Sequence, residues 1–215
     1  MNCERATGVV LRTRPLTDTS LIVHWLTDGL GRLATVAKGA RRPKSPFRGQ
    51  LDLFYLADLS FARSRRSELH ILREVKVLET HPGLRRDLAH LQQAYYCALL
   101  IEQTTETEAP LGALFDQFTR LLPALPQQPA RPQTIFAFEM KLLEGLGLKP
   151  NLAETKLSAG ARQILARMEE LEWDAVFRLG LSAAQTEEIR QFLHGFLTFH
   201  LGKIPAGRAA ALASG

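Results

Sequence analysis

The hydrophobic residues of this chain change their spacing near residue 80. Before that point they alternate with other residues, which is the period of half-buried strands. After it they recur every three or four residues, which is the period of amphipathic helices. We therefore expect an α+β protein of two domains, with an all-β domain in residues 1–80 and an all-α domain in residues 81–215.

The first 80 residues contain five segments of strand character and no helical segment between them. Five strands in so short a chain leave two open edges unless the sheet closes. The five-stranded OB-fold barrel is the commonest such solution, and an SH3-like barrel is the alternative. The predicted strands cover residues 7–14, 20–27, 32–38, 50–62 and 68–79, with a hairpin turn at "TDGLGR". In the fourth strand one face carries Leu51, Leu53, Tyr55, Ala57, Leu59 and Phe61.

The remainder of the chain is expected to form a helical bundle without internal repeats. The segment at 134–147 is apolar nearly all round, which predicts a buried central helix. Two further helices, at 158–171 and 182–202, each begin with a serine N-cap, and the second has capping-box spacing. Four prolines make 122–133 a loop. The first two helices cover residues 82–103 and 111–122, and the apolar stripe of the first consists of Leu84, Leu88, Leu91, Tyr95 and Leu99.

Positive charge is concentrated in the predicted barrel. Residues 1–80 contain 14 Lys and Arg against 8 Asp and Glu, a balance of +6, whereas the rest contains 13 against 14, a balance of −1. A localised positive field attracts polyanions, of which nucleic acid and anionic membrane are the main candidates. The sequence has neither a signal-peptide layout at its start nor an apolar run of about 20 residues. We expect a cytosolic protein that does not bind membranes.

The stretch "VAKGARRPKSPFRGQL" at residues 36–51 is the strongest binding candidate, since glycines and prolines keep its cations in a loop. Such cations neutralise phosphates and release counterions. We expect three basic clusters to form one DNA-binding groove: Arg12 and Arg14; Lys38, Arg41, Arg42, Lys44 and Arg48; Arg63, Arg65 and Arg66. The alternative is a solvated loop that contributes only solubility.

Few aromatic residues are present to stack on bases, so backbone contacts and sequence-tolerant binding are expected. Trp25, Phe54 and Tyr55 are better explained as core residues. Phe47 is the exception, because it lies between the basic residues and is the best candidate for stacking.

No pattern for catalysis, metal or cofactor binding occurs in the sequence. The histidines are scattered, and GxGxxG, GxxxxGK[ST], GxSxG, HExxH and CxxC are all missing. The two cysteines, Cys3 and Cys97, cannot complete a four-cysteine zinc site. We expect a protein that is not an enzyme and that needs no cofactor or metal.

The run "TGVVLRTRPLTDTSLIVHWLTDGLGRLATVAKGARRPKSPFRGQLDLFYLADLSF" resembles the RecO family of bacterial recombination mediators. Weaker likeness continues through "FAFEMKLLEGLGLKPNL" and "FLTFHLGKIPAGRAAAL", so most of the chain is covered. The resemblance implies an N-terminal OB domain, a helical domain, binding to single- and double-stranded DNA, and strand annealing. It also implies partnership with RecR and the single-stranded DNA-binding protein, and loading of RecA in a bacterial, nucleoid-associated role.

Two further expectations follow from this resemblance. Many relatives carry four zinc-binding cysteines after a "G..P.L" segment; here "GLGLKPNLAETKLSAGARQ" has none, so the helical domain should fold without zinc. The acidic, apolar tail of the DNA-binding partner could dock on Phe196, Phe199, Lys203 and Arg208, with a plain helix core as the alternative for the phenylalanines. An RNA-binding OB protein and a non-catalytic interaction scaffold remain the competing functions.

Overall fold

A computed structural model of the chain describes residues 3–213, which form two compact units. The barrel unit contains the chain up to Pro82 together with Thr105–Thr119. The helical unit contains Gly83–Thr104 and the chain from Arg120 onward. The units do not divide the chain at a single point, because residues 105–119 belong to the barrel unit, and no pattern in the sequence predicted this return.

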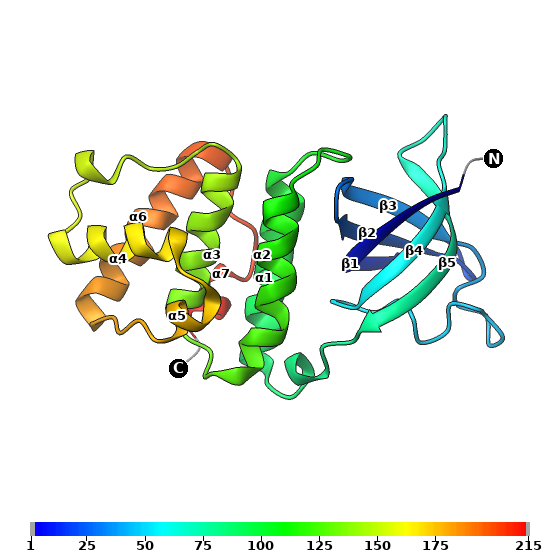
Figure 1. Cartoon of the computed structure of the whole chain (residues 1–215), viewed down its shortest axis with the longest axis horizontal. Coiled ribbons are helices and arrows are strands. Elements are labelled where there is room, and N and C mark those ends of the chain that lie inside the picture. Colours follow the sequence, from blue (N-terminus) through cyan, green and yellow to red (C-terminus); the bar gives the residue numbers. More distant parts are fainter. Residues whose placement is uncertain (1–2, 214–215) are drawn as a thin grey trace. The chain divides into compact units, whose positions relative to one another are not determined.

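Five strands close into a barrel in the order β1-β2-β3-β5-β4 (Figure 1). Neighbouring strands are antiparallel except β3 and β5, which are parallel. This closed five-stranded barrel is an OB-fold, as the sequence predicted. The strands are β1 (Cys3–Pro15), β2 (Leu21–Thr27), β3 (Gly31–Ala37), β4 (Leu56–Ala62) and β5 (Leu69–Glu79).

The barrel core confirms the alternation predicted for β4 but shortens the strand. Ala57, Leu59 and Phe61 all point into the core. The prediction that the strand begins near residue 50 was wrong, because Phe54 has a φ of 65°, which an extended strand cannot contain. Its amide donates to Val10 O at 2.8 Å, and its ring is fully buried. Residues 51–55 therefore form a turn that is anchored by the buried ring of Phe54 and resembles a strand only in its hydrophobic spacing.

The segment between the first two helices packs against the barrel, and we call residues 105–111 the strap. The Glu108 amide donates to Arg32 O at 2.7 Å, and Arg32 pairs with Thr107 in an isolated bridge. A Cβ atom at Gly31, where φ is +69°, would lie only 2.0 Å from Ala109 O. Glycine is therefore required at this position for both the turn and the close approach of the strap.

The helical unit is built around one nearly fully buried helix, α3 (Pro132–Gly145), as predicted. Ser158 and Ser182 cap α4 and α6, and Ser182 completes the capping box with Gln185. The other α-helices of the chain are α1 (Leu88–Thr104), α2 (Gly112–Ala124), α4 (Ala159–Glu170), α5 (Trp173–Phe177), α6 (Ala183–Leu201) and α7 (Arg208–Leu212), and the part of α2 up to Thr119 belongs to the barrel unit. Short 3-10 turns occur at η1 (Pro82–Arg85), η2 (Leu125–Gln127) and η3 (Leu152–Glu154).

The buried face of α1 is not the predicted apolar stripe. Leu88 is 68% exposed and Tyr95 is 42% exposed. The face that packs inward includes Gln93, whose side-chain amide donates to Arg131 O at 3.0 Å and Ala211 O at 3.1 Å. The prediction was wrong because polar residues that find buried hydrogen-bond partners shift the inward face of a helix.

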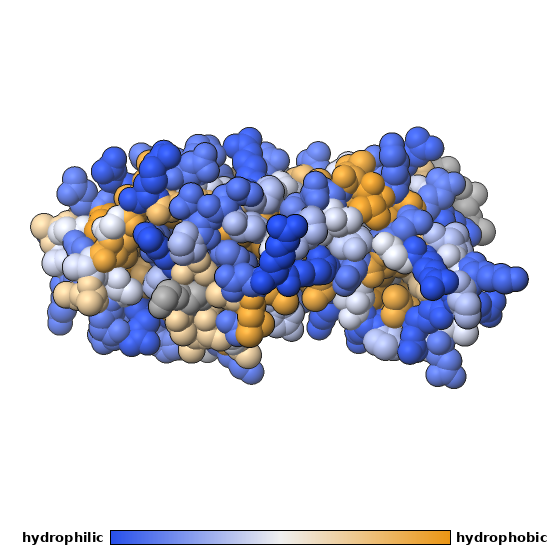
Figure 2. Space-filling model, turned by 90° about the horizontal axis from the view of Figure 1, so that it is seen from below, coloured by the Kyte–Doolittle hydropathy of each residue, from blue (hydrophilic) through white to orange (hydrophobic). Residues whose placement is uncertain are grey.

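Figure 2 shows mostly hydrophilic side chains on the side of each unit that it presents, with separate hydrophobic patches between them. Among residues 3–213, no helix combines the length and the hydropathy that crossing a membrane requires.

Candidate nucleic-acid interface

The outer face of β2 and β3 is the centre of the candidate site. Strand alternation places Val23 and Trp25 in the core and leaves His24 outside, opposite Ala34 of β3. On the other side of β2, Arg12 lies opposite His24 and Arg14 lies opposite Ile22. OB barrels bind oligonucleotides on this face and on the loops that connect β1 to β2 and β4 to β5.

A depression of about 420 Å³ lies on this face. Arg14, His24 and Arg32 line it, together with Ser67 and Thr107 among others. The sequence prediction included Arg14 but missed His24 and Arg32. The strand register brings both residues to this face, and the sequence pattern did not reveal it because neither residue belongs to a run of basic residues.

Arg32 is fixed in this depression by the first residue of the strap. Its Nε donates to Thr105 Oγ1 at 2.7 Å, and its Nη2 donates to the Thr105 carbonyl oxygen. A guanidinium that is held from one side loses less conformational entropy when an anion binds on the other.

Burial and the positive charges around His24 both lower its pKa. Burial lowers its pKa most strongly, and the charges of Arg12, Arg14 and Arg32 lower it further, to about 4. His24 is therefore a neutral ring among three guanidinium groups at neutral pH.

The basic loop extends this face beyond the end of β3. Lys38, Arg41, Arg42, Lys44 and Arg48 are all exposed. The Arg41 amide donates to Thr19 O at 3.0 Å, and its guanidinium donates to Thr17 O at 3.2 Å. These bonds join the loop to the β1–β2 connection, next to the strand ends that carry Arg14 and Ile22.

Phe47 anchors the basic loop in the barrel core. Its side chain is only 7% exposed and packs with core residues such as Trp25 and Phe61. The prediction that Phe47 stacks on bases was therefore wrong. An apolar side chain in the middle of a charged loop is more stable when it closes the end of the barrel than when it faces water. Trp25 and Phe54 are core residues, as expected, and Tyr55 packs at the edge of the core.

The third predicted cluster lies at the opposite end of the face, in the β4–β5 connection. Arg65 and Arg66 are exposed, whereas the guanidinium of Arg63 is bound by Glu4 at 2.8 Å and Glu108 at 2.6 Å. A smaller depression, of about 280 Å³, is lined by Arg63 and Arg65 among others. It shares Ser67, Glu68 and Thr107 with the depression around Arg32, so the two adjoin.

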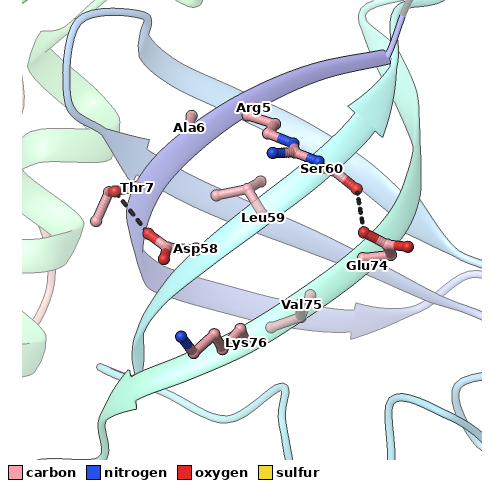
Figure 3. Close-up of a pocket in the computed structure, with 9 residues that line it drawn as sticks. All are labelled: Arg5, Ala6, Thr7, Asp58, Leu59, Ser60, Glu74, Val75 and Lys76. Carbon is pink, nitrogen blue, oxygen red and sulfur yellow. Dashed lines mark hydrogen bonds between the residues drawn. The ribbon is translucent and has the colours of Figure 1, made fainter.

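The outer face of β1, β4 and β5 has a different character (Figure 3). It carries a depression of about 680 Å³ in which Arg5 and Lys76 are matched by Asp58 and Glu74. Thr7 Oγ1 donates to Asp58 at 2.8 Å, and Ser60 Oγ donates to Glu74 at 3.4 Å. Because its charges cancel, this face lacks the positive field that attracts a polyanion.

The residues predicted to bind a partner have unequal surroundings in the helical unit. Phe199 is 83% exposed, Phe196 is half-buried, and their rings lie 5.0 and 4.3 Å from that of His200. Lys203 is exposed just after α6. Arg208 is buried instead and binds the carboxylate of Glu139, so it presents no exposed cation beside the phenylalanines.

Within the part of the chain that the structure describes, no group of three or more His, Cys, Asp or Glu side chains has a metal-binding arrangement. Cys3 is exposed in the barrel unit and Cys97 is buried in the helical unit.

Comparison with known proteins covers both units. Residues 1–81 match the family model described as "Recombination protein O N terminal", and residues 85–155 match "Recombination protein O C terminal". A DNA repair protein RecO of Anaeromyxobacter dehalogenans strain 2CP-C is 29% identical over 242 aligned positions, which include 97% of this chain and 95% of the relative.

Other relatives match a shorter region at higher identity. The DNA repair protein RecO of Rhodopirellula baltica is 34% identical over 143 residues, 66% of this chain and 53% of the relative. That of Roseiflexus sp. RS-1 is 34% identical over 150 residues, 70% of this chain and 52% of the relative. The chain thus spans about half the length of these two relatives. With an OB barrel under the first family model and helices under the second, the chain belongs to the RecO family.

Proposed function

We propose that this protein acts in DNA repair and recombination as a non-catalytic mediator. In this proposal it binds single- and double-stranded DNA, anneals complementary strands, and helps to load RecA onto single strands coated by the single-stranded DNA-binding protein. The observation that carries the proposal is the set of cations on the β2–β3 side of the barrel and on the loops at its two ends. The row of Arg12, Arg14 and Arg32 leads into the basic loop at one end and the β4–β5 connection at the other.

The chemistry of this face favours binding to phosphates. Its exposed cations neutralise the strand backbone, and its aromatic residues are mostly in the core. Two complementary strands that are both neutralised repel each other less, so the same face supports annealing as well as binding.

The partners in this proposal are RecR, the acidic tail of the single-stranded DNA-binding protein, and RecA indirectly. The exposed ring of Phe199, the half-buried ring of Phe196 and the nearby Lys203 support a tail-binding surface on the helical unit. A peptide with an apolar end and acidic residues fits such a surface. The protein would act in the bacterial cytoplasm, close to the nucleoid.

The decisive experiment measures oligonucleotide binding across a salt series. The triple variant Arg41→Gln, Arg42→Gln, Lys44→Gln should lose three phosphate contacts and flatten the log–log salt slope for single strands by about 2. A matched control, Lys156→Gln, Arg167→Gln, Arg178→Gln, removes the same charge from exposed positions of the helical unit. Equal effects of the two triples would contradict a specific interface on the barrel.

Two simpler assays separate the competing functions. Annealing of complementary DNA strands coated by the single-stranded DNA-binding protein is expected for the mediator, but not for an RNA-binding OB protein or a scaffold. Retention on a nucleic-acid column at moderate salt is expected for the first two, but not for a scaffold whose basic loop only faces solvent.

A further inference from the structure

One carboxylate of the barrel unit lies where an external anion could bind. Glu108, in the strap, places one oxygen 2.6 Å from Nη1 of Arg63 and the other 2.5 Å from Nε2 of His70. We propose that Arg63 and His70 form a binding site for a phosphate oxyanion, and that Glu108 occupies this site in the absence of ligand. The proposal concerns the end of the β2–β3 face and rests on the proposed function only for its natural ligand, a DNA phosphate.

Glu4 orients Arg63 for this role. Its two carboxylate oxygens accept hydrogen bonds from Nε and Nη2 of Arg63, each at 2.8 Å. This bidentate contact lowers the pKa of Glu4 and raises that of Arg63, so both groups stay charged. The third nitrogen, Nη1, is directed to Glu108 instead. Arg63 therefore presents a fixed donor to whichever anion lies beside it.

His70 supplies the second donor from a rigid position. Its ring is 2% exposed and stacks on Phe61, with the ring centroids 5.3 Å apart and the planes at 11°. The amide of Ser64 donates to Nδ1 at 3.3 Å, which requires that Nδ1 carry no proton. A neutral His70 therefore bears its proton on Nε2, aimed at Glu108. This arrangement donates to an anion without needing a charged imidazole.

Glu108 is held less firmly than the two donors. Its side chain is 37% exposed, and its backbone has a φ of 57°, in the left-handed region that favours glycine. Its amide is bonded to Arg32, so the side chain can turn outward while the strap stays in place. Burial tends to raise the pKa of Glu108, but the bonds from His70 and Arg63 outweigh it and lower the pKa. The competitor is thus a fully ionised carboxylate.

The position of the site fits a strand that follows the face. The depression beside Arg63 adjoins the one that contains Arg14 and Arg32, and Ser67, Glu68 and Thr107 line both. A phosphate that arrives along this path meets Arg63 Nη1 and His70 Nε2 as soon as Glu108 leaves. Glu108 therefore lowers the affinity of the face by keeping one phosphate position occupied.

The test compares Glu108→Gln with Glu106→Gln, its matched control. Glu106 is an exposed carboxylate of the same strap, so both variants remove one negative charge from the same region. With a single-stranded oligonucleotide, Glu108→Gln should bind more tightly and steepen the log–log salt slope by about 0.7, the value of one added phosphate contact. Glu106→Gln should leave the slope unchanged, and adding Arg63→Gln to Glu108→Gln should remove the gain. Equal slopes for the two single variants would overturn the proposal.

A second measurement uses inorganic phosphate and does not depend on nucleic acid. Phosphate should raise the Tm of Glu108→Gln more than that of the wild type, compared with chloride at equal ionic strength. If no variant binds oligonucleotide but this shift is present, the proposed function fails and the anion site stands. If oligonucleotide binds and the shift is absent, the anion site fails alone. Should Glu108→Gln not fold, Glu108→Gly removes the carboxylate and suits the left-handed backbone, and it must give the same results.

Discussion

The guanidinium of Arg208 binds both oxygens of the Glu139 carboxylate, at 2.7 and 2.9 Å, inside the helical unit. The hydroxyl of Tyr96 donates to the same carboxylate at 2.6 Å. This network joins α1, α3 and α7. Arg208→Ala would leave Glu139 buried without its cation, so we expect a loss of about 3–5 kcal/mol in the free energy of unfolding. Urea denaturation measures this loss.

The matched variant for this pair is Arg208→Met with Glu139→Met. Removing both charges avoids an unpaired buried carboxylate, so the double variant should be more stable than Arg208→Ala. A loss below about 1 kcal/mol for Arg208→Ala would show that water or another cation satisfies Glu139.

DNA binding should strengthen as the pH falls from 7 toward 5. In the free protein, burial and three neighbouring arginines lower the pKa of His24 to about 4, so it is neutral in this range. A bound phosphate screens those arginines, which raises the pKa of His24 and favours proton uptake on binding. Fluorescence anisotropy at constant ionic strength checks the prediction. His24→Gln removes the titrating group, and an unchanged pH dependence in this variant would refute the assignment.

The same residue should affect stability with a defined sign. An unfolded histidine titrates near its ordinary pKa of 6.5, whereas the folded one titrates at about 4. Between these values the unfolded state binds more protons, so stability is lost as the pH falls from 6.5 toward 4. Thermal melting at several pH values should show a smaller decrease for His24→Gln over that window. Equal decreases in the wild type and His24→Gln would mean that other groups cause the loss of stability over this pH range.

Phe47 should be essential for the stability of the basic loop, but its aromatic ring should not be needed for DNA binding. Phe47→Ala removes a core side chain that is 7% exposed, which should lower the free energy of unfolding by about 3–5 kcal/mol. Phe47→Leu should lose less free energy of unfolding than Phe47→Ala, because it leaves a smaller cavity, and it should keep the salt slope for single strands. A large loss of DNA affinity in a stable Phe47→Leu protein would restore the base-stacking role that the structure excludes.

Phe199 should contribute to partner binding and little to stability. Its side chain is 83% exposed, so Phe199→Ser should change the free energy of unfolding by less than about 0.5 kcal/mol. Calorimetry measures the affinity for an acidic peptide with an apolar C-terminal end. This affinity should be at least fivefold lower in Phe199→Ser, a loss of about 1 kcal/mol, because an exposed anchor is removed. Leu88→Ser, at a position 68% exposed on α1, is the control. Equal weakening in both would indicate nonspecific hydrophobic binding.

Elements whose hydrophobic spacing reflects burial were predictable from the sequence. The closed barrel, the inward face of β4 at Ala57, Leu59 and Phe61, the buried helix α3 and the cap at Ser182 all followed from local patterns. The patterns failed where a tertiary contact decided the outcome. Phe54 sits in a left-handed turn because its ring fills the core, and no periodicity carries that information.

The candidate site was predictable only in part, for a similar reason. Charge runs identify the basic loop, but ion pairing decides which cations are available to bind an external anion. Arg63 is bound by two carboxylates, one 59 residues away and the other 45, and Arg208 is bound by Glu139, 69 residues away. Conversely, Arg32 belongs to no cluster in the sequence and enters the site through strand register and its bonds to Thr105.

The return of the strap to the barrel unit makes the chain cross between the two units three times, after Pro82, before Thr105 and after Thr119. A fragment cut at Pro82 would lose Thr105, whose hydroxyl and carbonyl oxygens fix the guanidinium of Arg32 in the binding face. The barrel therefore cannot be transplanted as a simple N-terminal module. A chimaera that joins this barrel to a different helical domain would have to include the strap as a second segment. A single crossover in the gene near Pro82 would separate the barrel from its strap and disrupt the binding face.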